Sequence, residues 1–321
     1  MSIPIPPHTE SPSPASGVKS THSGNGCLWG GLVLLALPLA FITLLSLTAG
    51  PQLARAGSRL LSNNLGRSDL SLQILEVAEL IWPGSAVIHD DLGKAYLEIG
   101  NSALAIDEFN TATSLDSNLA TAQNNLAVTR LAAGLSSQAI ANLQAAAELD
   151  PGSTQVYLNL GLAYQAIGQL DKAQDSFQHA ADLDPDRPDV FTELGGNALM
   201  QHDLAAAKGY FEQALALDPG NAAGLQGLGL ILLVADRPAD ALAYLKVASA
   251  LRPLDPSGHL YLGMALAALN QTSPARAELQ RALSISRVAA ISDLAKARLD
   301  SLNSAPLSSS GRSGGAVKQT P

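Results

Sequence analysis

Apolar and small residues return at fixed positions along the middle of the chain. In one example, Leu160 is followed 13 positions later by Ala173. A large apolar residue, Phe177, comes four positions after that, and a second alanine, Ala180, comes three positions further on. These spacings place the three side chains on one face of a helix. The recurring Leu precedes a small residue and steps by 34 residues, at Leu92-Gly93, Leu126-Ala127, Leu160-Gly161, Leu194-Gly195, Leu228-Gly229 and Leu262-Gly263.

Glycine and proline divide each unit into two helical stretches. A glycine falls between the stretches, where a turn requires a positive φ, at Gly100, Gly134 and Gly168. Proline follows the second stretch and ends it, at Pro151, Pro185, Pro219 and Pro253. Each unit is therefore predicted to be a helix–turn–helix hairpin with apolar residues on both sides, which stacking on its neighbours buries.

This pattern resembles the tetratricopeptide repeat family in its period and its residue signature. The unit 154–187 contains every element of that signature, at Tyr157, Leu160, Gly161, Tyr164, Gly168, Ala173, Phe177, Ala180 and Pro185. The resemblance implies an all-α, right-handed solenoid. We expect six repeats over 86–289, a capping helix over 290–303, and a degenerate first repeat over 52–85 that keeps Gly66, Ala78 and Pro83.

The chain outside the repeats has a different composition. Residues 1–26 and 304–321 are rich in Pro, Ser or Gly and are predicted to be disordered tails. Residues 27–49 contain no charged side chain, and a helix of that length crosses a hydrocarbon core of about 30 Å. We therefore expect a single-pass membrane protein. The sequence leaves open on which side of the membrane its repeats lie. The alternative is a secreted or periplasmic protein whose signal peptide is cleaved after Ala54-Arg55-Ala56.

Composition and charge narrow the function classes. Apolar residues make up 47% of the chain and aromatic residues only 4%, which favours helices packed through Ala and Leu. The 28 Asp and Glu exceed the 19 Lys and Arg, and the formal net charge of -9 argues against nucleic acid as a partner. Cys27 is the single cysteine, so no intrachain disulfide forms.

The motifs that suggest chemistry lack the setting that chemistry needs. The sequence Gly311-Arg312-Ser313-Gly314-Gly315 matches a nucleophile elbow, but it lies in the predicted tail and no His follows it. The run from Asp182 to Asp186 has Arg187 where a calcium loop needs Gly. The six histidines show no ligand spacing. We expect no enzyme activity, no cofactor, no metal site and no small-molecule substrate.

The family resemblance also implies a candidate site. The first helices of successive repeats line a concave groove that holds a peptide or amphipathic helix of a protein partner. One groove position maps to Asp90, Asn124, Leu158, Thr192, Gln226 and Leu260, and the position four residues later maps to Lys94, Val128, Leu162, Gly196, Leu230 and Met264. The groove is thus expected to be polar near the second repeat and apolar toward its C-terminal half.

Two comparisons within the family refine the expected partner. Repeats that bind the acidic C-termini of heat-shock chaperones use several basic groove residues, whereas Lys94 stands alone here. Asn125 and Asn159 resemble the asparagine row of protein O-linked N-acetylglucosamine transferase, which binds peptide backbone, but Asp91, Glu193, Gly227 and Tyr261 interrupt it. The expected function is a scaffold or adaptor for other proteins. A self-associating structural scaffold is the alternative.

Overall fold

The computed structural model describes residues 50–62 and 68–304, which form 15 α-helices and no strand. Apart from Ser304, the two predicted tails, and the whole of the apolar segment 27–49, lie outside these ranges. The helices are α2 (Gly50–Ser62), α3 (Ser68–Ile81), α4 (Ala86–Glu98), α5 (Ser102–Leu115), α6 (Ala120–Ala132), α7 (Ser136–Leu149), α8 (Thr154–Ala166), α9 (Leu170–Leu183), α10 (Pro188–Met200), α11 (Leu204–Leu217), α12 (Ala222–Val234), α13 (Pro238–Leu251), α14 (Pro256–Ala268), α15 (Thr272–Ile285) and α16 (Ala289–Ser304).

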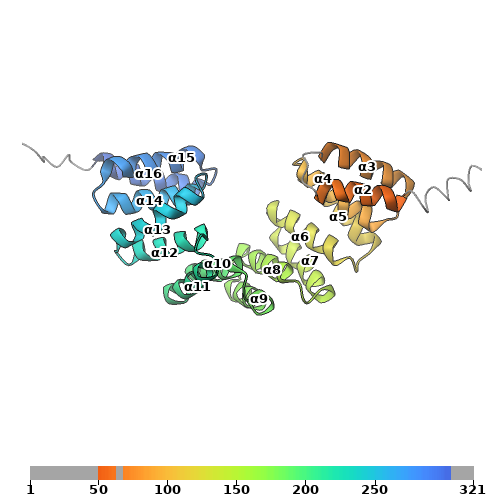
Figure 1. Ribbon diagram of the computed structural model, residues 1–321, viewed down its shortest axis with the longest axis horizontal. Helices are drawn as coiled ribbons and strands as arrows, with labels where there is room; N and C mark the ends of the chain where they lie inside the picture. Colours follow the sequence, from red (N-terminus) through yellow and green to blue (C-terminus); the bar gives the residue numbers. More distant parts are fainter. Residues whose placement is uncertain (1–49, 63–67, 305–321) are drawn as a thin grey trace, which may run out of the picture.

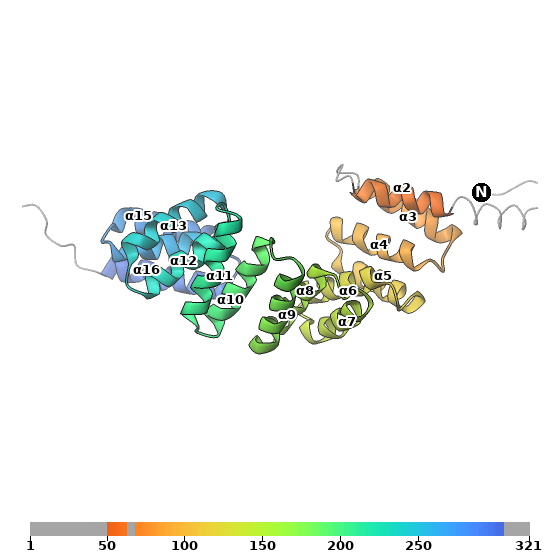
Figure 2. The same ribbon diagram turned by 60° about the horizontal axis from the view of Figure 1, so that its bottom comes forward.

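Consecutive helices pair as hairpins, and the hairpins stack into an arc (Figure 1). Each even-numbered helix packs against its hairpin partner, the preceding odd-numbered helix and, in most repeats, the next even-numbered helix. Because the even-numbered helices approach one another and the odd-numbered ones do not, the even-numbered helices form the concave inner side. The view in Figure 2 shows α2 and α16 at opposite ends of the stack. The expected all-α repeat solenoid is confirmed.

The Leu-Gly pairs let the two helices of a hairpin approach closely. A Cβ atom added to Gly161 on α8 would lie 2.3 Å from Cε1 of Phe177 on α9. Gly93, Gly195, Gly229 and Gly263 face the equivalent large residue of their own hairpins in the same way. The third repeat differs, because it has Ala127 in place of the glycine, together with Leu143 in place of Phe. The small residue of the pair is therefore required by the large residue opposite it.

The turns between the two helices of a hairpin have a left-handed residue at a fixed position. Gly100, Gly134 and Gly168 have φ of 80°, 77° and 75°, as their place in the sequence predicted. The next three repeats place side chains there instead, with His202 at 63°, Asp236 at 55° and Asn270 at 57°. A residue with a Cβ is strained in this region, although Asn and Asp tolerate it better than most.

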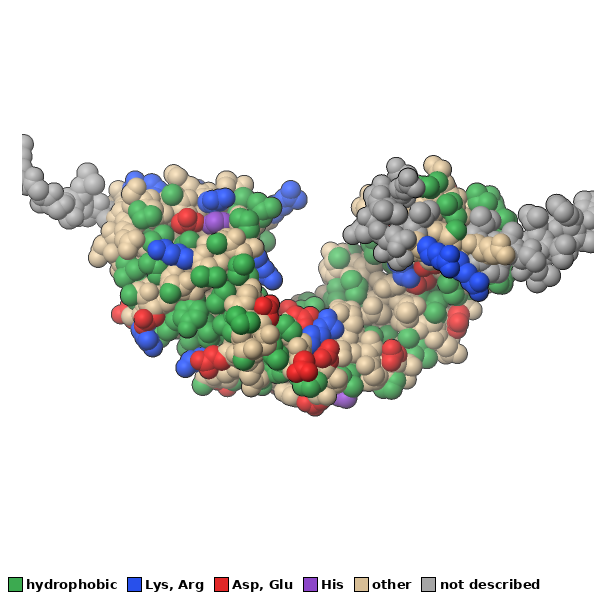
Figure 3. Space-filling view, viewed as in Figure 1, with side chains coloured by type: hydrophobic (Ala, Val, Ile, Leu, Met, Phe, Trp, Pro, Cys, Tyr) green, Lys and Arg blue, Asp and Glu red, His purple; other side chains and the backbone are tan. Residues whose placement is uncertain are grey.

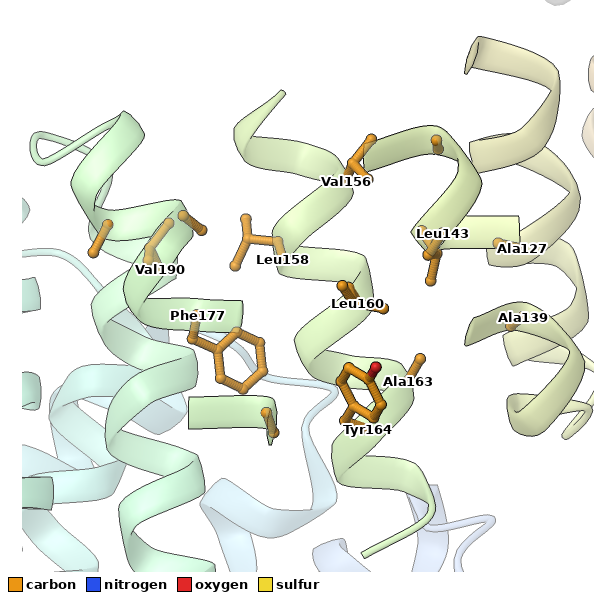
Figure 4. Packing of buried hydrophobic residues seen from close by; sticks show 14 of the residues in the cluster. Ala127, Ala139, Leu143, Val156, Leu158, Leu160, Ala163, Tyr164, Phe177 and Val190 are labelled. Atoms are coloured by element: carbon orange, nitrogen blue, oxygen red, sulfur yellow. The ribbon is translucent and has the colours of Figure 1, made fainter. Parts of the chain in front are cut away.

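The core consists of one large apolar residue and several alanines per repeat. Phe109, Leu143, Phe177, Leu245 and Leu279 are fully buried on the odd-numbered helices. Figure 4 shows the centre of the stack, where Leu158 points from α8 toward the helix of Val190. Burial of such side chains stabilises by about 1.5–3 kcal/mol each, and it joins each repeat to the next.

The structure corrects the predicted localisation. No helix within residues 50–62 and 68–304 is long and apolar enough to span a membrane; the longest, α16, has 16 residues. This finding contradicts the single-pass membrane protein expected from the sequence. That expectation depended on residues 27–49, which lie outside the described residues.

Candidate functional site

A row of exposed apolar side chains follows the inner side of the arc. Most of its members come from the second half of successive even-numbered helices, because the 34-residue period returns the same helix phase to the same face. This apolar row comprises Leu97 (37% exposed), Val128 (39%), Leu162 (37%), Met200 (49%) and Val234 (61%), with Leu131, Leu199, Leu230, Leu233 and Met264 half-buried beside them. Exposed apolar side chains gathered on one face are typical of an interaction site.

A row of polar side chains lies on the first half of the same helices. Asn125 Nδ2 donates to Asp90 Oδ1 at 2.8 Å, and Asn159 Nδ2 donates to Asn124 Oδ1 at 2.8 Å. Gln155 Nε2 donates to Asn159 Oδ1 at 3.1 Å. The first two bonds cross from one repeat to the next, so these amides hold neighbouring repeats together. The two asparagines of the expected row thus bond to other side chains of the inner helices, Asn125 to Asp90 and Asn159 to Asn124 and Gln155.

The only basic residue of the expected groove is neutralised by its neighbours. Lys94 Nζ lies 2.7 Å from Asp90 Oδ2 and 3.0 Å from Asp91 Oδ1. Burial alone would lower the pKa of Lys94, but the two carboxylates outweigh it and raise that pKa above its ordinary value. Asp91 also accepts a hydrogen bond from the Ser58 hydroxyl on α2. The positive charge of Lys94 is therefore compensated by carboxylates of the same protein.

Acidic side chains mark the middle of the inner side. Burial raises the pKa of Glu193 on α10, and the negative charge of Asp189 one turn earlier raises it further. Arg187 offsets part of that charge, since its Nε lies 2.8 Å from Asp189 Oδ1 and its Nη2 donates to Gln155 Oε1 at 2.8 Å. Figure 3 shows acidic and basic side chains gathered near the middle of the arc.

Comparison with known proteins identifies the family. One tetratricopeptide repeat model matches residues 130–192 and 198–259, and a second matches residues 91–154. Together these matches span just over half of the 321 residues. The chain belongs to the tetratricopeptide repeat (TPR) family. Proteins of this family typically mediate protein–protein interactions. No curated protein sequence matches it.

Solved structures share the fold of this TPR protein at low sequence identity. A chain of the APC/C hetero-tetramer Cut9–Hcn1 is 24% identical, with a TM-score of 0.63 over 73% of this chain and 46% of that chain. This chain thus spans less than half of the length of that relative. PilF of Pseudomonas aeruginosa is 22% identical (TM-score 0.57; 66% and 97% of the chains), and a TPR protein of Parabacteroides merdae is 15% identical (0.64; 76% and 98%).

The residues predicted to line the TPR groove fall into three groups. Val128 and Leu162 are exposed on the inner side. Half-buried positions there are Lys94, Asn124, Asn125, Thr192, Gly196, Gln226, Leu230 and Met264. The remaining four are buried and have almost no surface to offer, at Asp90 (3% exposed), Leu158 (4%), Asn159 (7%) and Leu260 (2%). Leu158 and Leu260 pack against the adjacent hairpins.

Polarity divides the inner side along each helix. The sequence predicted polar repeats followed by apolar ones, whereas the structure places the polar row beside the apolar row in the second to fifth repeats. The predicted set lacked the apolar residues at the ends of the inner helices, such as Met200 and Val234, and also Arg298 on α16. It lies 34 residues after Met264, so the repeat period points to it once α16 is treated as the next inner helix and not only as a cap.

Two histidines of this TPR protein occupy the same place in different repeats. His89 Nδ1 lies 2.7 Å from Glu108 Oε2 while its Nε2 faces the Pro83 carbonyl at 3.0 Å. His259 repeats this geometry with Glu278 and the Pro253 carbonyl at 2.6 and 3.1 Å. Each buried ring ties the two helices of its hairpin to the preceding linker. Among the described residues, no group of three or more His, Cys, Asp or Glu is placed to hold a metal ion.

Two hollows outside the inner rows have polar side chains at their rims. A hollow of about 480 Å³ lies between α11 and α13, with Lys208–Glu212 at 3.5 Å and Arg237–Asp240 at 2.6 Å on its rim. A more open one of about 680 Å³ lies between the α8–α9 turn and the end of α10. Gln201 Nε2 donates to Asp171 Oδ1 across it at 3.2 Å.

Proposed function

We propose that the apolar row on the inner side of the arc binds an amphipathic helix of a protein partner. The observation that carries this proposal is the row itself, which exposes at least one apolar side chain on each inner helix from α4 to α12. An amphipathic helix buries its own apolar face in such a groove and leaves its polar face in water. Burial of this surface supplies the free energy of binding.

The polar row favours a helix over an extended peptide as the ligand. An extended peptide leaves its backbone N–H and C=O groups unpaired unless the groove supplies partners. The amides that would do so, on Asn124, Asn125 and Asn159, are bonded to one another or to Asp90. A helix satisfies its own backbone groups and needs only apolar contact.

Variants of exposed groove residues test the proposal. Leu162→Asp and Val128→Asp place charges on the inner side, and because both side chains are more than one-third exposed the fold should survive. Val247→Asp, at a side chain 50% exposed on the outer helix α13, is the matched control. Leu260→Asp is unsuitable, since that side chain is only 2% exposed.

The measurement is affinity capture from cell extract followed by mass spectrometry and cross-linking. We expect a partner that wild type and Val247→Asp retain, that both inner variants lose, and whose cross-linked segment gains helical circular dichroism on binding. Equal capture by all four proteins would reject the groove. A captured segment that stays non-helical would reject the helix. Concentration-dependent light scattering of the purified protein alone would favour the self-associating alternative.

A further inference from the structure

A hollow lies on the inner side at the C-terminal end of the stack. It has a volume of about 350 Å³, at the small end of the range of ligand pockets. Three even-numbered helices form it, α12, α14 and α16. Its apolar lining consists of Leu233, Met264, Ala267, Ala268 and Leu302. The apolar row therefore ends in a concave pocket and not on a flat surface.

The hollow exists because the repeat pattern changes at α14. The last two inner positions of the two preceding inner helices are large and apolar, with Leu199-Met200 on α10 and Leu233-Val234 on α12. The same two positions of α14 are Ala267 and Ala268. Two side chains are thus truncated to methyl groups between α12 and α16, which leaves room for atoms from another molecule.

A basic residue lies at the edge of this hollow. Arg298 on α16 lines it together with Ser301. Within the described residues its guanidinium makes no hydrogen bond or ion pair, whereas Lys94 at the same helix phase is held by two carboxylates. An unpaired guanidinium beside an apolar lining fits a ligand that joins a carboxylate to a large apolar group.

We propose that this end pocket anchors a large apolar side chain of the partner, with a carboxylate of the same segment beside Arg298. The inference rests on the proposed function and specifies one end of the bound segment. Its apolar group replaces the side chains that α14 lacks, and its carboxylate fixes the position of the segment along the groove. The carboxylate is that of a neighbouring acidic side chain of the bound helix.

Methionine methyl signals provide a direct test on the full chain. The chain has three methionines, of which Met264 lines the pocket and Met200 lies on the apolar row two repeats away. Protein labelled with ¹³C at the methionine methyl is titrated with N-acetyl-leucine and with uncharged N-acetyl-leucinamide. We expect a saturable shift of the Met264 signal, a fixed Met200 signal, and about threefold to fivefold tighter binding of the acid.

Two variants separate the apolar and the ionic parts. Arg298→Gln should remove the preference for the acid and leave binding of the amide, while Lys296→Gln on the same helix should change neither. Ala268→Leu should fill the hollow and abolish both shifts while helical circular dichroism stays at the wild-type level. A Met264 signal that does not move, or moves together with Met200, overturns the pocket. Equal affinity for acid and amide overturns the carboxylate.

Failure of this inference is distinguishable from failure of the proposed function. Leu162→Asp lies on α8, far along the stack from α14, and should leave the Met264 titration unchanged. If Met264 responds but Leu162→Asp still captures the partner, the pocket stands and the groove proposal fails. If Leu162→Asp loses the partner while Met264 does not respond, the groove stands and the end pocket is rejected.

Discussion

A Cβ atom added to Gly161 would lie 2.3 Å from Cε1 of Phe177, closer than two carbon atoms approach in a folded protein. We therefore expect Gly161→Ala to destabilise the chain by roughly 1–3 kcal/mol, the cost of overpacking a buried contact. Gly209→Ala on α11 is the control, because no atom lies within 4 Å of the added methyl. It should stabilise by up to about 1 kcal/mol. Urea unfolding followed by circular dichroism measures both.

The third repeat suggests how the Gly161→Ala defect is repaired. Combining Gly161→Ala with Phe177→Leu recreates the Ala127 and Leu143 pair of that repeat. The double variant should be more stable than Gly161→Ala alone. If the smaller side chain gave no recovery, contact with Phe177 would not be the cause of the defect.

The left-handed turn residues predict stabilising changes. His202 has φ of 63°, and replacing it with Gly relieves the contact between its Cβ and the backbone. We expect His202→Gly to raise stability by up to about 1 kcal/mol after the entropy cost of glycine. The reverse change at the equivalent turn, Gly134→Ala, should lower it by about 1 kcal/mol. Thermal unfolding midpoints that move the other way would show that the turns are not strained.

The buried ring of His89 should be replaceable only by a side chain with similar hydrogen bonds. The third repeat has Gln123 at this position, which donates to the Ser117 carbonyl and accepts from Asn142. His89→Leu leaves Glu108 and the Pro83 carbonyl without a donor and should cost about 1–3 kcal/mol. The double change His89→Gln with Glu108→Asn should recover most of it. Urea midpoints compare the three proteins.

The raised pKa of Glu193 predicts a pH dependence with a definite sign. Because burial and Asp189 raise this pKa in the folded state, the folded protein binds the proton more tightly than the unfolded chain does. The contribution of Glu193 to the free energy of unfolding is greatest at low pH. It falls as the pH rises from about 4.5 through the pKa that this group has in the folded state. Glu193→Gln should therefore be more stable than wild type at pH 7, with the difference vanishing at acidic pH. Glu212→Gln, in an exposed ion pair on α11, is the control for general charge effects.

The repeat fold could be predicted because each of its requirements has a residue signature. Close approach of two helices needs a small residue opposite a large one, and a left-handed turn favours glycine, so Gly161 and Gly168 reveal hairpins without any structure. The last three turns were not predicted, because His202, Asp236 and Asn270 meet the same backbone requirement without that signature.

Much of the groove could not be predicted, because burial at a helix phase depends on the neighbouring helices. Leu158 and Leu162 lie one turn apart on α8, yet the first is 4% exposed and the second 37%. The pairing of Asn159 with Asn124 depends on the separation between two inner helices, which one repeat alone does not determine. Arg298 was not predicted as a groove residue because its helix was interpreted as a capping helix that covers the last repeat.

The inner helices α8 and α10 make less direct contact with each other than the other successive inner helices do. Other successive inner helices touch more closely than these two, and an open hollow with the Gln201–Asp171 hydrogen bond lies at the same junction. Opening the inner side at this joint therefore separates fewer contacts between inner helices than opening it elsewhere, while Leu158 of α8 stays in one buried cluster with Val190 of α10. Tension applied to the two ends should straighten the arc first at the joint between α8 and α10. Leu162 on α8 and Met200 on α10 lie on opposite sides of this joint, so straightening would change the distance between them.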